Sequence, residues 1–262
     1  MSVKSHSIHH VFSKPYPFEI FLPQGPGPFP AIFITPLLGR IAVLEDLYFE
    51  RKFARFFAEN GLASIVIGRP IFEYASSRGL EQIQSYIEES LERNRGVLKH
   101  VLQESWIDKR KLGSFGMSFG SIINTLWAAS EKQLRVNVFA MGGGNLPEIF
   151  MKSQDPLMKS YRNAAQTHSG LSLAALKNNL KSIFQPDPLS VAPSIAREQT
   201  LLILGRWDRV VPIQHGRELQ AAMNHPETIL LPAGHYLSLL AFPFIRHSVL
   251  KFFKIKFQSL QS

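Results

Sequence analysis

The sequence of 262 residues contains no cysteine. A disulfide framework, a thiolate metal site and a cysteine nucleophile are therefore excluded, so any chemistry must use oxygen and nitrogen groups. Long hydrophobic runs are also missing. The longest run, 239–245, is interrupted by Pro243 and is far too short to span a bilayer, and residues 1–20 lack the apolar core of a signal peptide. We therefore expect a cytoplasmic protein without a membrane-spanning segment.

Acidic residues are scarce. The chain has 20 Asp and Glu against 29 Lys and Arg, which gives a net charge of +9, and no acid follows Glu227. Such a balance favours anionic partners. Nucleic acid is not expected among them, because the basic residues are scattered and no DNA- or RNA-binding module is visible.

Three histidines near the N-terminus, His6, His9 and His10, suggest a metal site. Neighbouring residues of a strand point to opposite faces, and no carboxylate lies beside these histidines, so they do not converge on one ion. We expect neither a metal nor another cofactor.

Apolar strands alternate with amphipathic helices along most of the chain. The sequence predicts an N-terminal antiparallel hairpin over 5–12 and 16–22, then buried strands at 31–34, 62–68, 112–115, 135–141, 201–208 and 228–231. Helices are predicted at 45–60, 81–104 with a break near Gly96, 122–129, 213–223 and 236–257. This pattern is typical of a single α/β domain over 1–262 with a mostly parallel sheet and helices on both faces.

Residues 145–196 differ from the rest because loop formers and short amphipathic stretches replace buried strands. We interpret this segment as a helical cap or lid over a pocket. The alternative is a pair of helices that merely cover the sheet. The last predicted helix, 236–257, is basic and aromatic, so it packs on the sheet or lies on an anionic membrane.

The most informative stretch is 111–121, KLGSFGMSFGS. A strand that reverses sharply into a helix leaves room only for small residues two places either side of the turning residue, and Gly116 and Gly120 stand there around Ser118. An apolar strand precedes the serine, and apolar residues at helical spacing follow it. This order predicts an exposed serine at a strand-to-helix turn.

Two polar residues follow later buried strands. Asp208 stands at the end of the strand that begins at 201, and His235 comes after the strand 228–231, so the chain order is Ser, Asp, His. With these motifs, nearly the whole chain resembles the α/β-hydrolase family. The resemblance implies that Ser118 is the nucleophile, His235 its general base and Asp208 the acid that orients the base. Asp187 is a rival for the acid position.

The family's oxyanion donors are also implied by the resemblance. The first is the backbone N–H of Phe119, the residue after the serine. The second lies after the strand 31–34, where a His-Gly pair is replaced by Thr35 and Pro36. Because the donating position is the next residue, Leu37 can still serve.

The implied function is a serine hydrolase that cleaves a carboxylic ester or thioester through an acyl-enzyme, with a peptidase or acyltransferase left open. A non-catalytic member of the fold that binds a ligand or partner, and an interfacial lipase, are also compatible with the sequence. Arginines after buried strands, above all Arg40 and Arg69, predict contacts with an anionic substrate. Oligomeric state is not indicated.

Overall fold

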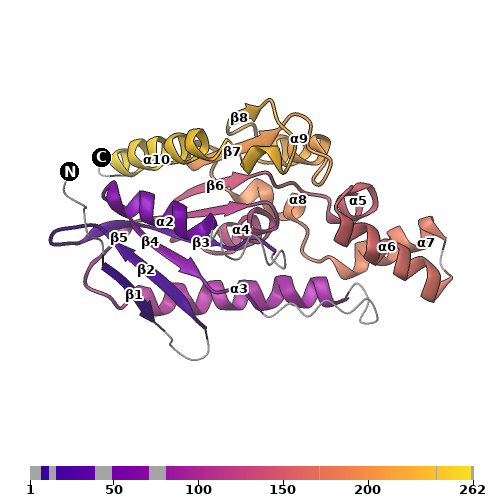
Figure 1. The fold of residues 1–262 in the computed structure, drawn as a ribbon, viewed down its shortest axis with the longest axis horizontal. Coiled ribbons are helices and arrows are strands. Elements are labelled where there is room, and N and C mark those ends of the chain that lie inside the picture. The colour runs from indigo at the N-terminus through magenta and orange to yellow at the C-terminus, as the bar shows by residue number, and fades with distance from the viewer. Residues whose placement is uncertain are drawn as a thin grey trace.

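The computed structural model describes residues 7–11, 16–38, 49–70, 81–170, 172–239 and 241–260. Within these ranges, eight strands form a single sheet in the order β1-β2-β4-β3-β5-β6-β7-β8 (Figure 1). The strands are β1 (Ser7–Val11), β2 (Phe18–Leu22), β3 (Phe29–Thr35), β4 (Ala63–Ile67), β5 (Ile107–Met117), β6 (Val136–Ala140), β7 (Thr200–Gly205) and β8 (Glu227–Leu231).

The first two strands run against the rest of the sheet. β1 pairs antiparallel with β2, and β2 pairs antiparallel with β4, whereas every later pairing from β4 to β8 is parallel. The predicted hairpin and the mostly parallel sheet are therefore confirmed. Because the parallel strands share one direction, the residues that follow β3, β5, β7 and β8 meet at the same edge of the sheet.

Helices cover both faces, which explains why the central strands are continuously apolar. The helices are α2 (Phe49–Glu59), α3 (Glu81–Val101), α4 (Phe119–Ser130), α5 (Leu146–Lys152), α6 (Pro156–Ser169), α7 (Leu173–Ile183), α8 (Pro188–Val191), α9 (Ile213–Ala222) and α10 (Phe242–Ser259). Ile32 and Ile34 of β3 pack toward α2 and α10, while Phe33 packs toward α3 and α4.

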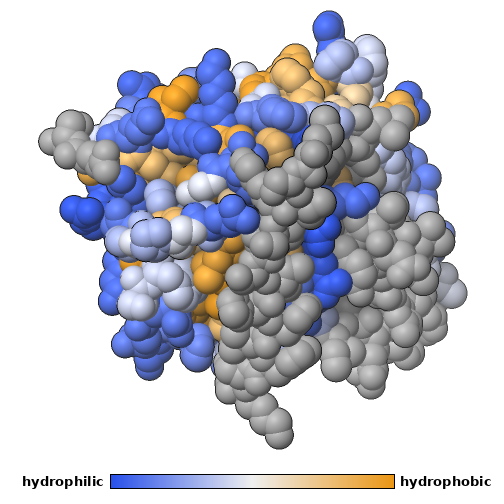
Figure 2. All heavy atoms as spheres, turned by 60° about the vertical axis from the view of Figure 1, so that its left-hand side comes forward, coloured by the Kyte–Doolittle hydropathy of each residue, from blue (hydrophilic) through white to orange (hydrophobic). Residues whose placement is uncertain are grey.

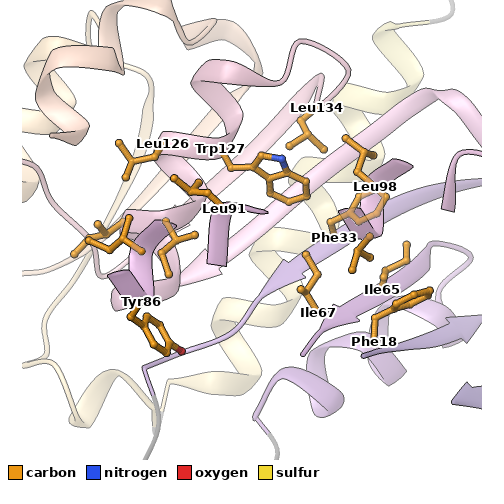
Figure 3. Close-up of a cluster of buried hydrophobic side chains, with 14 of the residues drawn as sticks. Phe18, Phe33, Ile65, Ile67, Tyr86, Leu91, Leu98, Leu126, Trp127 and Leu134 are labelled. Carbon is orange, nitrogen blue, oxygen red and sulfur yellow. The ribbon is translucent and has the colours of Figure 1, made fainter. Parts of the chain in front are cut away.

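Trp127 of α4 lies in the hydrophobic core between the sheet and the helices α3 and α4. Its side chain is fully buried, and its ring meets the ring of Phe33 edge-on at 5.8 Å between centroids. Leu91 and Leu98 of α3 and Ile65 of β4 complete the cluster (Figure 3). This packing fixes α4, and with it the serine at its start, against the sheet.

The largest differences from the sequence-based prediction concern α3, the strand before Ser118 and the last helix. α3 continues through Gly96 without a break, because the absence of a side chain there lets the ring of Tyr16 pack against the helix. The serine strand already begins at Ile107. The last helix begins at Phe242, since a short 3-10 turn, Leu237–Leu239, follows His235 first.

The helices α5, α6 and α7 stand together beyond the sheet, at the right of Figure 1, and α3 extends toward them. In the view that brings the left-hand side of Figure 1 forward, the coloured residues are mainly hydrophilic, and the hydrophobic ones lie between them in small groups (Figure 2). α10 packs on the sheet through Ile245, Val249 and Phe253, as expected of a final helix in this fold. Among the described residues, no helix is both long enough and apolar enough to cross a bilayer.

Candidate active site

Ser118 occupies a sharp turn between β5 and α4. Its φ of 54° and ψ of −123° are strained for a residue with a side chain, and its N–H is fixed by a 2.8 Å hydrogen bond to the carbonyl of Ala140. A Cβ on Gly116 would come within 2.3 Å of the Gly120 carbonyl oxygen, and a Cβ on Gly120 within 2.6 Å of the Thr35 carbonyl oxygen. Both glycines are therefore required by close backbone contacts.

A chain of hydrogen bonds joins the serine to a buried acid. Ser118 Oγ lies 2.8 Å from His235 Nε2, and His235 Nδ1 lies 2.7 Å from Asp208 Oδ2. An ionised carboxylate only accepts hydrogen bonds, so Nδ1 carries the proton and Nε2 is left to accept the serine hydroxyl. The three residues that the sequence singled out are thus brought together.

Asp208 is held in place by its other oxygen. Oδ1 accepts the backbone N–H groups of Val210 and Val211 at 2.8 and 2.9 Å, and the residue is only 6% exposed. These bonds aim Oδ2 at the imidazole.

Asp187, the rival acid, has a different environment. Its carboxylate accepts the backbone N–H groups of Asn145, Leu146 and Leu189, and it caps the short helix α8. It makes no hydrogen bond to His235 in the described part of the chain. Its role is to join the loop after β6 to the start of α8.

The two predicted oxyanion donors differ. Phe119 is the first residue of α4, so its N–H has no partner within the helix and lies next to the serine. The N–H of Leu37 instead donates a 2.9 Å hydrogen bond to Glu50 Oε1. In this structure the donor is therefore engaged by a buried carboxylate, which is a strong acceptor, and the role of Leu37 toward a substrate stays a prediction.

Arg69 also binds Glu50. Its Nη2 lies 2.8 Å from Glu50 Oε1, and the Glu50 side chain is 7% exposed. Arg69 does not line the cavity described below, so the predicted contact with substrate is not supported. Arg40 lies outside the described residues.

A cavity of about 520 Å³ opens at the serine. It lies between the sheet edge with α3 and α4 on one side and, on the other, the helices α5 and α6 of the segment 145–196 that the sequence analysis interprets as a cap. Apart from Ser118, Ser153, Asp155, His235 and Tyr236, the described residues that line it are apolar: Leu37, Leu38, Ile83, Ile87, Met117, Phe119, Ile122, Met141, Leu146, Ile149, Phe150, Pro156, Leu157, Met158, Phe184, Val210 and Val211.

Two hydrogen bonds tie the cap to the loops that carry His235 and Asp208. The hydroxyl of Tyr236 donates to Asp155 Oδ2 at 2.8 Å, and the N–H of Gln154 donates to the carbonyl of Arg209 at 2.8 Å. Burial and the bond to Asp155 raise the pKa of the Tyr236 phenol above its usual range. The phenol therefore stays neutral and acts as a donor.

Sequence reasoning missed Glu50, Asp155 and Tyr236. Asp155 before Pro156 is a recognisable helix start, and its Oδ1 does cap α6, but that pattern says nothing about a contact with Tyr236. Among the described residues, no group of three His, Asp or Glu side chains lies together in a way that could hold a metal ion.

A known protein family matches the first part of the chain. The sequence model of the family described as "Esterase FrsA-like" matches residues 13–166, which is more than half of the chain. The chain belongs to the FrsA-like esterase family. The matched segment contains the serine turn but ends before Asp208 and His235.

Two FrsA-like relatives are bacterial proteins named Esterase FrsA. The protein of Escherichia coli O81 (strain ED1a) is 28% identical over 154 residues, which is 58% of this chain and 34% of the relative. That of Salmonella paratyphi B is 26% identical over 141 residues, 54% of this chain and 31% of the relative. The matches thus span about a third of the length of these relatives.

Solved structures extend the likeness to almost the whole chain. A 2,6-dihydroxy-pseudo-oxynicotine hydrolase superposes with a TM-score of 0.63 at 20% identity and covers 95% of this chain and 66% of that one. An acetyl xylan esterase from Paenibacillus sp. R4 superposes with a TM-score of 0.65 at 14% identity and covers 95% and 88%. At these identities the likeness establishes the fold, and the predicted α/β-hydrolase fold is confirmed.

Proposed function

We propose that this FrsA-like protein is a serine hydrolase that cleaves a small ester or thioester through an acyl-enzyme. The observation that carries the proposal is the unbroken hydrogen-bonded chain from Ser118 through His235 to Asp208, with the serine facing the cavity. The family name and the esterase among the structural neighbours support the same reaction class.

The first half of the reaction forms the acyl-enzyme. Ser118 Oγ attacks the substrate carbonyl carbon while its proton passes to His235 Nε2. Asp208 stabilises the resulting imidazolium through Nδ1–H. The carbonyl oxygen becomes an oxyanion, which the N–H of Phe119 and the positive end of α4 stabilise. The imidazolium then gives its proton to the departing alcohol or thiol as the bond to it breaks.

The second half repeats these steps with water. His235 takes a proton from a water molecule as the water attacks the acyl carbon, and the proton returns to Ser118 when the acid product leaves. Leu37 contributes its N–H only if that group turns away from Glu50, to which it is bonded here. The preformed part of the oxyanion site is therefore Phe119 with the start of α4.

Replacing the nucleophile tests the proposal. Ser118→Ala removes the attacking oxygen, so kcat for an activated aryl ester should fall by about 10⁴ to 10⁶-fold, while the thermal unfolding temperature stays close to that of the wild type. Ser121→Ala is the matched control, because Ser121 is a fully buried serine one turn into the same helix. Activity of Ser118→Ala within tenfold of wild type would favour a ligand-binding member of the fold.

A further inference from the structure

The charged groups that the structure describes at the cavity are negative. The described residues that line it include one carboxylate, that of Asp155, and no lysine or arginine. A second carboxylate, Asp208, lies directly behind His235. Among the described residues, a ligand in this cavity therefore meets apolar side chains and negative charge.

Asp155 is fixed at the cavity by bonds to both of its oxygens. Oδ1 accepts the N–H groups of Leu157 and Met158 at 2.9 and 3.2 Å, and Oδ2 accepts the hydroxyl of Tyr236. The ring of Tyr236 in turn meets the ring of His235 edge-on at 5.6 Å between centroids. The carboxylate is thus held near the reacting atoms and cannot easily rotate away.

Two arginines in this region, Arg162 and Arg69, are engaged elsewhere. Arg162 of α6 donates to the carbonyls of Phe150 and Ser153, at 2.6 and 3.4 Å through Nη1. Arg69 donates to Glu50. Neither guanidinium lines the cavity, so neither offsets the charge of Asp155 for a ligand inside it.

We propose that the cavity holds an uncharged, chain-like apolar group of the ester, and that Asp155 disfavours a negative charge there. The inference rests on the proposed function, because it concerns the substrate of the same site. It reverses the prediction of an anionic substrate that the arginine positions suggested. The reason is that the described lining would desolvate an anion without giving it a cationic partner, which costs far more than leaving the anion in water.

Binding to the full chain carrying Ser118→Ala tests this without turnover. The ligands are phenyl acetate, butyrate, hexanoate and octanoate, and monophenyl octanedioate as the anionic partner of the octanoate, each measured by titration calorimetry. We expect Kd to fall about fourfold for each methylene that becomes buried. We also expect the octanedioate monoester to bind at least about tenfold more weakly than the octanoate.

A charge variant separates the part played by Asp155. Asp155→Asn in the same background keeps an oxygen that caps α6 and places an amide NH₂ where Oδ2 stood. The Tyr236 oxygen can accept from this NH₂, so the contact is retained and the charge is removed. We expect the ratio of the Kd of monophenyl octanedioate to that of phenyl octanoate to be several-fold smaller in this variant than in its parent. This difference between variant and parent should shrink at high salt, because salt screens the charge of Asp155. Asp108→Asn is the control, because it removes an acid paired with Arg110 on β5, away from the cavity, and should leave the ratio unchanged.

Several results would overturn the inference: a monoester anion that binds as tightly as the octanoate, an acetate that binds as tightly as the octanoate, or equal effects of Asp155→Asn and Asp108→Asn. Failure of the proposed function is distinguishable. In that case the chain-length and charge preferences hold, but the wild-type protein leaves the esters intact and Ser118 does not react with a fluorophosphonate.

Discussion

The backbone N–H of Leu37 and the carboxylate of Glu50 are joined by a 2.9 Å hydrogen bond, and the same carboxylate oxygen accepts Arg69. This contact connects the loop after β3 to the first turn of α2. The loop also packs against Gly120, next to the serine turn. Glu50 therefore fixes one wall of the candidate site.

Removal of this carboxylate should destabilise the protein. Glu50→Ala leaves the Leu37 N–H and the Arg69 guanidinium without an acceptor, and each such loss costs about 1–3 kcal/mol. Glu50→Gln retains an acceptor for Leu37 and should cost less. The measurement is thermal unfolding, with Glu89→Ala as control, because the exposed pair of Glu89 with Arg93 contributes little. Equal losses from Glu50→Ala and Glu89→Ala would contradict this account.

The two rival acids should respond differently to an amide. Asp208→Asn replaces a charged acceptor by an amide, whose NH₂ donates to His235 Nδ1 and leaves the proton on Nε2, where the serine hydroxyl needs an acceptor. We therefore expect kcat to fall by about 10⁴-fold with little change in unfolding temperature. Asp187→Asn should instead lower stability by about 1–3 kcal/mol, because one of its three backbone donors would face an amide NH₂. Steady-state kinetics and thermal unfolding of both variants separate the roles. A larger kcat loss in Asp187→Asn would make Asp187 the acid.

The cavity should be shortened by a larger side chain on α6. Met158→Trp places an indole into the lining, so kcat/KM for an octanoate aryl ester should fall at least about tenfold relative to that for the acetate. Leu173→Trp on α7 is the control, because Leu173 is 53% exposed and does not line the cavity. A ratio that is unchanged in Met158→Trp, or changed equally in both variants, would place the ester chain elsewhere.

Acid should loosen the contact between α5 and α7. Hydrogen bonds from Lys177 and then Lys152 hold the pKa of Glu148 below its usual range. A carboxyl with a lowered folded-state pKa contributes stability above its unfolded value of about 4.3, and the contribution is lost as the pH falls through the lower folded value. Because the pair is exposed, the effect is below about 1 kcal/mol. The thermal unfolding temperatures of wild type and Glu148→Gln should therefore differ at pH 7 and become equal near pH 3. A difference in unfolding temperature that persists at low pH would contradict this prediction.

Local sequence patterns were enough to place the serine, because a strand, two glycines and a helix leave only one compatible turn geometry around Ser118. Asp208 and His235 were found by their position after buried strands, since parallel strands deliver their following residues to one edge. Asp187 could not be excluded from the sequence. Asp187 precedes a proline and Asp208 follows an apolar strand, and neither pattern excludes the role of triad acid. The three-dimensional contacts are needed to show that Asp187 caps α8.

The remaining features depend on contacts between distant segments. Glu50 is an ordinary helical acid in the sequence, and nothing local indicates that it takes the N–H of Leu37 or pairs with Arg69. The cavity lining comes from α3, α4 and the cap, which are far apart along the chain. The positions of the arginines after buried strands suggested an anionic substrate. A position after a strand determines where a side chain starts, but it does not determine which partner that side chain binds, and Arg69 binds Glu50.

The most direct test of the central claim is covalent labelling of the serine. Wild-type protein is treated with a fluorophosphonate, digested and mapped by mass spectrometry, beside His235→Ala and Ser121→Ala. The account predicts one adduct, on Ser118, that forms at wild-type rate in Ser121→Ala and is strongly slowed in His235→Ala, because the imidazole activates the hydroxyl. An adduct on another residue, no adduct in folded protein, or labelling that is unaffected by His235→Ala would contradict it.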